Sequence, residues 1–230
     1  MITNYNEFIV ELHKAGFSGA VFGKDDGVFG LYRYGWGAEE ETGMEWHTGN
    51  PDTDPWEWRI RVLDECDNIA YAKVFFRKGG YITREWYPYF LAVRRGLNDF
   101  EDDYAEGILN QTTKRIYDVV SKHGSLPVDE IKRIAGFHRK EKSKFESALS
   151  ELQMRMYLTM HGVAYKVSST GEQYGWGTMV YSTTEHFWGE DVFNEAAIID
   201  PEEAIDKITE QIFKLNPMAQ EKKIMKFIKG

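Results

Sequence analysis

The amino-acid sequence predicts an α+β protein with a winged helix-turn-helix at its centre. Residues 110–166 read as a helix, a short helix, a long helix and an alternating strand, which is the element order of a winged helix-turn-helix. The same residues hold eleven Lys and Arg against six Asp and Glu, a net charge of +5, in a chain of net charge −9. The rest of the chain therefore carries −14. A basic module in an acidic protein is typical of a site for a polyanion.

The long helix of this module is the most regular helical pattern in the chain. Its apolar residues recur at steps of three and four, which places them in one stripe on a helix of period 3.6. The other side of the helix is rich in Lys, Glu and Ser. We expect the stripe to be buried against the two preceding helices, in a core of Phe145, Leu149, Leu152, Met156, Ile116, Val120, Ile131 and Ile134.

The short middle helix has signals at both ends. Ser125 can cap it, Pro127 suits its first turn, and Asp129 and Glu130 suit the positive end of a helix. Gly136 can end it in a left-handed conformation. These signals predict a helix that begins after Ser125 and stops before Gly136.

The N-terminal region begins with a helix and continues into a glycine-rich run. Asn4 and Glu7 have the spacing of a capping box, and Gly16 is expected to end the helix. The run over residues 17–37 contains many glycines and aromatic residues. It matches neither a phosphate-binding loop nor a dinucleotide fingerprint, so its glycines are expected to serve turns and close packing.

A block rich in tryptophan follows, with Trp46, Trp56 and Trp58 within thirteen residues. Asp54 is expected to cap a helix that Pro55 opens. The block has two interpretations, a ligand site of carboxylates, arginine and stacking rings, or an aromatic core whose indole N–H groups neighbouring carboxylates satisfy. We favour the core, with Trp56 and Trp58 buried. The candidate ligand pocket consists of Trp56, Glu57, Trp58, Arg59 and Trp86.

Alternating runs predict strands elsewhere in the chain. Residues 69–82 read as a strand and turn, residues 157–166 and 176–183 as the strands of the wing, and residues 201–215 as a C-terminal helix. The acidic stretch 98–107 marks a boundary. The expected parts are an aromatic-rich N-terminal α+β region over residues 1–107, the winged helix-turn-helix over 108–185, and a C-terminal helical segment over 186–230.

Several kinds of site and location are disfavoured by what the sequence lacks. Cys66 stands alone among acidic residues, so neither an internal disulfide nor a nucleophilic thiol is expected. The six histidines lack the spacing of a zinc site, no Gly-x-Ser-x-Gly motif occurs, and we expect neither a metal nor a cofactor. No signal peptide or membrane-spanning stretch is recognisable, which predicts a cytoplasmic protein.

Three stretches together resemble a known family. They are DPWEWRIRVLDE at residues 54–65, IAYAKVFFRKGGYITREWYPYF at 69–90, and the helices from KRIYDVV to SALSELQMRMYLT at 114–159. They are similar to the bacterial AlkZ-related proteins, distant relatives of the AlkZ/YcaQ-type DNA glycosylases, which are built from winged-helix modules. The resemblance implies a winged-helix fold and binding to nucleic acid.

The resemblance does not extend to glycosylase activity. The glycosylases carry a Gln-x-Gln or Gln-x-Asp motif that positions the water attacking the sugar. None of the candidate glutamines completes this motif here: Gln111, Gln153, Gln173, Gln211 and Gln220. No catalytic residue is therefore assigned, and whether the protein is an enzyme stays open.

Three functions remain as hypotheses. The first is DNA binding, in which the third helix enters the major groove and the wing touches the backbone. The second is an enzyme that acts on a nucleobase or small ligand in the tryptophan-rich region. The third is a protein-interaction scaffold whose basic helix packs on an acidic partner. For the first hypothesis, the expected contacts are Arg139, Lys140, Lys142, Lys144 and Arg155.

Overall fold

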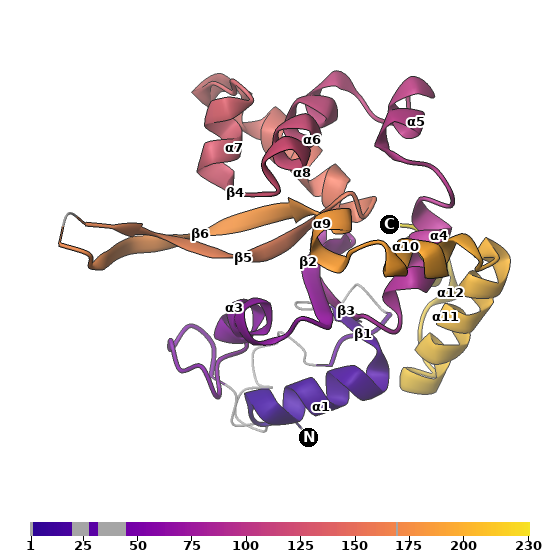
Figure 1. The fold of residues 1–230 in the computed structure, drawn as a ribbon. Helices are drawn as coiled ribbons and strands as arrows, with labels where there is room; N and C mark the ends of the chain where they lie inside the picture. Colours follow the sequence, from indigo (N-terminus) through magenta and orange to yellow (C-terminus); the bar gives the residue numbers. More distant parts are fainter. Residues whose placement is uncertain (1, 20–27, 32–44, 169) are drawn as a thin grey trace. The chain divides into compact units, whose positions relative to one another are not determined.

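The computed structural model describes residues 2–19, 28–31, 45–168 and 170–230 (Figure 1). Helices and antiparallel strands alternate along the chain, which confirms the α+β class. The chain forms two compact units, which we call unit 1 (Met1–Leu97 with Glu190–Gly230) and unit 2 (Asn98–Gly189). The glycine-rich run over residues 17–37 lies largely outside the described residues.

Unit 1 combines three antiparallel strands with helices from both parts of the chain. The central strand β3 pairs with β1 on one side and with β2 on the other. The strands are β1 (Phe17–Gly19), β2 (Ile69–Phe75) and β3 (Lys78–Thr83). The helices are α1 (Tyr5–Ala15), α3 (Pro55–Glu65), α4 (Tyr87–Arg94), α10 (Asp191–Ala197), α11 (Pro201–Leu215) and α12 (Glu221–Lys229).

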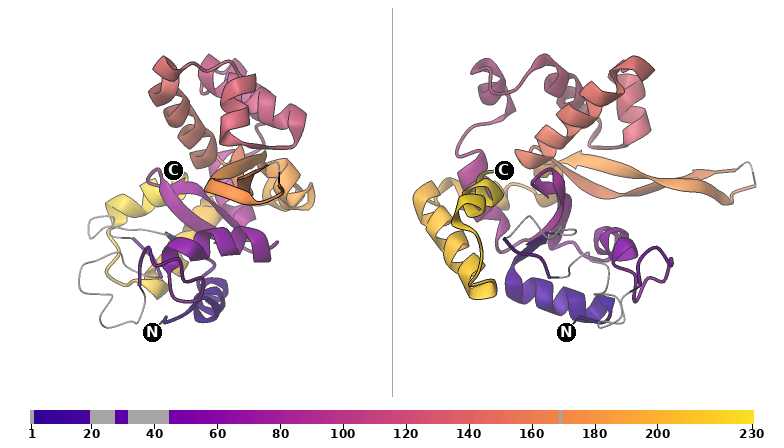
Figure 2. Two further views of the ribbon diagram at one scale, coloured as in Figure 1. Left: turned by 90° about the vertical axis from the view of Figure 1, so that its left-hand side faces the viewer. Right: turned by 180° about the vertical axis from the view of Figure 1, so that it is seen from behind.

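An aromatic cluster fills the core of unit 1. Phe227 of α12 stacks on Phe75 of β2 with ring centroids 3.8 Å apart, and the rings of Phe17 and Phe90 lie within 6.3 Å of that of Phe227. Figure 2 shows α12 beside α11 in the view from behind. Because Phe227 belongs to the C-terminal part of the chain and the other three rings to the N-terminal part, the two parts share one core.

The start and end of α1 follow the sequence signals, with one difference. Asn4 accepts a hydrogen bond from the backbone N–H of Glu7, as predicted. The Glu7 carboxylate bonds to the backbone and hydroxyl of Thr3 instead of the backbone of Asn4. Gly16 ends the helix with φ +86°, and an added Cβ would lie 2.1 Å from the Trp86 ring. Only glycine fits there, because both the left-handed backbone and the indole exclude a side chain.

Unit 2 contains three further antiparallel strands, which pair in the order β5-β6-β4. The strands are β4 (Ser125–Pro127), β5 (Leu158–Val167) and β6 (Gln173–Thr183). The helices are α5 (Phe100–Ala105), α6 (Gln111–His123), α7 (Val128–Ile134), a 3-10 turn (Arg139–Glu141), α8 (Lys142–Met154) and α9 (Thr184–Trp188). The β5–β6 hairpin extends beyond the helices of unit 2 (Figures 1 and 2).

The predicted start of the middle helix is wrong. Ser125 caps no helix, because it lies in β4 and pairs with Ser182 of β6. Pro127 is the last residue of that strand, and α7 begins only at Val128. The conformation before a proline is biased towards an extended backbone, and the residues before Pro127 form a strand. The helix end is as expected, since Gly136 has φ +69°.

The predicted core of unit 2 is confirmed except at one position. Ile134 is 37% exposed, because it is the last residue of the short helix α7, where the chain turns away from the core. The other members are buried: Phe145, Leu149, Leu152, Met156, Ile116, Val120 and Ile131. Six residues from three helices, with Met156 from the connection between α8 and β5, therefore form one core in this unit.

Leu152→Ala should lower the free energy of unfolding by about 2–5 kcal/mol, because Leu152 is fully buried and its truncation leaves a cavity. Ile134→Ala is the matched control at the exposed position and should cost less. Urea denaturation followed by circular dichroism measures both. Equal stability of the Leu152→Ala variant and the unmodified protein would contradict the assignment of Leu152 to the core.

Candidate functional site

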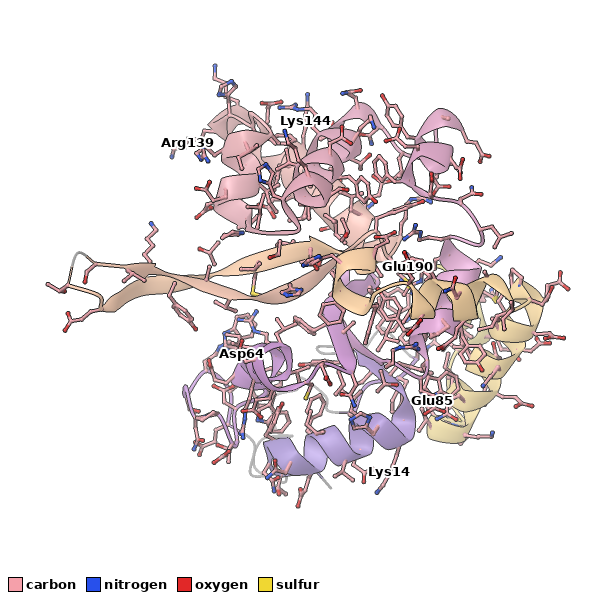
Figure 3. All side chains as sticks on the ribbon, in the orientation of Figure 1. Lys14, Asp64, Glu85, Arg139, Lys144 and Glu190 are labelled. Atoms are coloured by element: carbon pink, nitrogen blue, oxygen red, sulfur yellow. The ribbon has the colours of Figure 1, made fainter. Side chains whose placement is uncertain are left out.

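Four of the five cations predicted for DNA binding lie together at the start of α8. Arg139 and Lys140 belong to the 3-10 turn before the helix, and Lys142 and Lys144 to its first turn. All four side chains are exposed. Figure 3 shows Arg139 and Lys144 at the helical end of unit 2, away from the β5–β6 hairpin. Among the described residues, none of the four forms an ion pair.

Many other cations of unit 2 are compensated by carboxylates. Lys114 binds Glu101 and Asp118. Lys132 lies 3.0 Å from Glu146, and Arg133 lies 2.6 Å from Glu130. In the described part of the chain, the four cations at the start of α8 differ from these in forming no ion pair with a carboxylate.

The charges at the start of α8 also oppose the helix dipole. The first turn carries Lys142 and Lys144 and no acidic residue, although the N-terminus of a helix is already positive. The N-cap residue Glu141 makes no capping bond to α8. Its carboxylate instead accepts bonds from the backbone N–H of His138 and from Arg115, which hold the pKa of Glu141 below its usual range. This helix end therefore gathers four cations without a side-chain cap, and this positive charge suits an anion.

Arg155, the fifth predicted cation, lies at the other end of α8. It is the C-cap residue, is half-buried, and pairs with Glu151 at 3.6 Å. The structure thus groups Arg139, Lys140, Lys142 and Lys144 and leaves Arg155 apart. We call these four residues the α8 basic cluster.

In the tryptophan-rich block, only one of the two tryptophans of α3 is buried. Trp58 is fully buried, stacks on Phe8 at 5.1 Å, and donates its indole N–H to the carbonyl of Asp52. Trp56 is 37% exposed, and the guanidinium of Arg59 lies 3.5 Å above its ring. The expectation that both are buried is therefore wrong. Residues two apart on a helix lie about 200° apart around its axis, so both cannot face one core.

Trp86 belongs to a different part of unit 1. It precedes α4 and packs edge-on against Phe17 at 5.3 Å, and Lys207 of α11 lies over its ring. Glu57 is half-buried on α3. The structure thus gives Trp56, Trp58 and Trp86 separate ring partners, and the pocket they were grouped in stays a prediction.

One hollow in unit 2 was not predicted from the sequence. Its volume is about 370 Å³, and it lies between the start of α5 and the last turns of α6. The stacked rings of Phe100 and Tyr117, 3.9 Å apart, form part of its wall. The lining residues are Asp99, Phe100, Glu101, Tyr117, Asp118, Ser121 and Lys122. They come from two helices, so no local sequence pattern connects them.

Asp54 has a larger structural role than the predicted cap. It is fully buried and accepts the backbone N–H of Trp56 at 2.8 Å, as expected for the N-cap of α3. Its second oxygen accepts the backbone N–H groups of Thr48 and Gly49 at 2.8 and 3.1 Å. One carboxylate therefore fixes both the helix start and the preceding loop.

Two histidines lie close together at the base of the β5–β6 hairpin. The ring centroids of His161 and His186 are 5.7 Å apart, and His161 Nδ1 is 3.2 Å from the Ser182 hydroxyl. Partial burial lowers the pKa of His161, and the neighbouring His186 lowers it further.

No metal site is recognisable in the described ranges, where no group of three or more His, Cys, Asp or Glu side chains is arranged to hold an ion. Over the same residues, no helix has the length and apolar character needed to cross a membrane.

The fold and the basic helix end define an α+β protein with a surface suited to an anion. The family model described as AlkZ related matches residues 2–229, so the chain belongs to the AlkZ-related family and the resemblance is confirmed. Among solved structures, it is similar to Streptomyces sahachiroi DNA glycosylase AlkZ, with 12% identity and a TM-score of 0.40. That match covers 76% of this chain and 50% of the other, so this chain spans about half of that protein's length. No curated protein matches the chain.

Asp54→Ala should lower the free energy of unfolding by about 1–3 kcal/mol, because it leaves several backbone N–H groups without their acceptor. Asp54→Asn keeps one acceptor oxygen and should cost less. Thermal and urea melts measure the difference. If Asp54→Ala is as stable as the unmodified protein, the bonds of Asp54 to the helix start and to the loop contribute nothing.

Acidification should destabilise the protein partly through His161. Because folding lowers the pKa of His161, the unfolded chain binds a proton more readily, and stability falls as the pH drops through the ordinary histidine range. The unmodified protein should therefore lose more stability between pH 7.5 and 5.5 than His161→Gln does. Urea denaturation at both pH values measures this, with His123→Gln as the control. Equal losses in the unmodified protein and His161→Gln would exclude the effect.

Proposed function

We propose that residues 108–185 form a winged helix-turn-helix that binds DNA. The order α6, β4, α7, α8, β5, β6 supports this assignment, with α7 and α8 as the helix pair and the β5–β6 hairpin as the wing. In such a module, the N-terminal part of the third helix meets the major groove. That helix is α8, and its N-terminal part carries the α8 basic cluster.

The observation that carries the proposal is the charge at the start of α8. Four exposed cations lie there without a carboxylate partner among the described residues, and two of them stand in the first turn against the helix dipole. Each such cation costs about 0.3–1 kcal/mol of helix stability at most. A phosphate at this position would relieve the repulsion, because it meets the lysines and the arginine together.

Binding is proposed without glycosylase chemistry. The name of the similar Streptomyces protein describes a DNA glycosylase. No glutamine of this chain stands in the Gln-x-Gln or Gln-x-Asp motif expected of that activity. The proposal is therefore a DNA-binding role for a cytoplasmic member of the AlkZ-related family, with residues 1–107 and 186–230 as the flanking parts.

The second candidate is an enzyme that acts on a nucleobase or small ligand near α3. The observation in its favour is the exposed ring of Trp56, with Arg59 above it and the ring of His47 at 4.9 Å. Such a group can stack on a planar ligand. Because Trp58 and Trp86 are buried, this candidate site has fewer accessible rings than the sequence predicted.

Lys142→Glu with Lys144→Glu should abolish DNA binding without lowering the melting temperature, because both side chains are exposed and acidic residues suit the start of a helix. Binding of the unmodified protein to a labelled duplex is measured by fluorescence anisotropy at several salt concentrations. Four phosphate contacts predict a slope of roughly −4 for log K against log salt, and a Kd of about 10⁻⁴ to 10⁻⁶ M for non-specific binding.

Lys14→Glu with Lys214→Glu is the matched control. It makes the same change in net charge at two exposed lysines of unit 1, and Lys14 extends away from α1 in Figure 3. This variant should bind DNA nearly as the unmodified protein does. If neither duplex nor single-stranded DNA binds at low salt, the proposal fails and the module is a scaffold for protein contacts. Equal loss of binding in both variants would assign the effect to net charge alone.

A further inference from the structure

A second group of lysines lies on α12 in unit 1. Lys222, Lys226 and Lys229 follow one another at steps of four and three, so they share one face of the helix, and all three are exposed. Lys223 is half-buried beside them, and Glu221 is the only acidic residue of the helix. In the described part of the chain, no ion pair involves any of these four lysines.

Helix stability accounts for only two of these lysines. Lys226 and Lys229 lie in the last turn, where cations suit the helix dipole. Lys222 and Lys223 lie in the first turn, where cations oppose it. The same unfavourable placement marks the start of α8. Two helices of an acidic chain thus carry positive charge where it costs local stability.

Packing holds α12 in place and uses its apolar face. Ile224, Phe227 and Ile228 are buried, and Phe227 stacks on Phe75. The buried guanidinium of Arg94 donates to the carbonyl oxygens of Phe227 and Ile228, each at 2.8 Å, at the end of the helix. The lysine face is therefore presented on a fixed helix, and no apolar stripe remains free for insertion into a lipid bilayer.

The β2–β3 turn adds positive charge beside α12. Lys226 Nζ lies 5.9 Å from the centre of the Phe76 ring, so the turn and the helix are neighbours. Phe76 and Arg77 have φ of 51° and 60°, a left-handed conformation that non-glycine residues rarely adopt. Arg77 and Lys78 are exposed. The strained turn therefore brings two further cations to this side of unit 1.

We propose that the lysine face of α12, with the β2–β3 turn, is a second surface that binds the phosphate backbone of nucleic acid. Lys222 and Lys229 lie about 10 Å apart along the helix, from the 1.5 Å rise per residue, which suits contact with two or three phosphates. The choice of nucleic acid as the ligand rests on the proposed function. The surface itself belongs to unit 1 and uses no residue of the α8 basic cluster.

The test uses the full chain and a labelled random-sequence duplex of about 25 base pairs, long enough for several phosphate contacts. Lys222→Glu with Lys226→Glu should weaken binding and reduce the magnitude of the salt slope by about 2, because each phosphate contact contributes about 1. Lys14→Glu with Lys214→Glu again controls for net charge and should leave the slope unchanged. A thermal melt checks folding, and Lys222→Gln with Lys226→Gln replaces the reversal if that variant does not fold.

The outcomes separate the two surfaces. If the α12 variant keeps the full slope while Lys142→Glu with Lys144→Glu loses binding, the α12 inference is wrong and the proposed function stands. If the α12 variant loses binding and the α8 variant does not, the inference stands and the role of α8 fails. Absence of DNA binding by the unmodified protein overturns both. Vesicles with about one third phosphatidylserine test a lipid surface, and lysine-dependent binding to vesicles without an effect on DNA overturns the inference in favour of a membrane.

Discussion

The stack of Phe227 on Phe75 is the contact on which unit 1 depends. It joins α12 to the sheet, and Arg94 reinforces it by bonding to the last carbonyls of α12 and to the carbonyl of Val74. Burial lowers the pKa of Arg94 to about 9, so its guanidinium is still charged at neutral pH and gives strong hydrogen bonds. Since unit 2 lies between these segments in the sequence, the core of unit 1 can close only after the whole of unit 2 has been made. Contacts this distant in sequence slow folding, because a long loop must close first.

Two helices of this chain carry positive charges in their first turn that lower the stability of the helix. A chain selected for helix stability alone would place carboxylates in the first turn, as α11 does with Glu202 and Glu203. Helix α8 places two lysines and no carboxylate there, and α12 places Lys222 and Lys223 there beside Glu221. Departures from a local rule are expected where a residue serves a partner outside the fold. The two departures are independent, since they occur in different units, and both favour an anionic partner.

Elements with a strong local pattern could be predicted from the sequence, whereas positions set by tertiary contacts could not. The stripe of α8, the Asp54 cap and the Gly16 helix end were correct, because each follows from spacing or backbone conformation. Ser125 was misassigned because a capping residue and a short edge strand look alike until the partner β6 is known. Trp56 was misplaced because both tryptophans were assigned to the core, although they face different sides of one helix. In the candidate site, the α8 basic cluster is exposed, as a basic helix face in the sequence suggests. The ion pair of Arg155 with Glu151 could not be predicted, because it depends on which carboxylates near Arg155 are already paired with other cations.

An acidic chain can bind a polyanion if its cations act at short range. At about 0.1 M salt the Debye length is about 10 Å, so carboxylates farther than this from a bound phosphate repel it weakly. Cations in contact with the phosphate are screened far less, because no ions fit between the two groups. The net charge of −9 therefore slows the diffusion of a polyanion towards the protein more than it weakens the ion pairs of the bound state. Electrostatic steering of the polyanion should be poor. Binding of this kind depends on geometry at the α8 basic cluster, where Lys142 and Lys144 stand beside the first amides of the helix, and less on the overall field of the protein. Lower salt lengthens the range of the carboxylates as well as that of the lysines, so at very low salt the affinity should rise less steeply than the contact count implies.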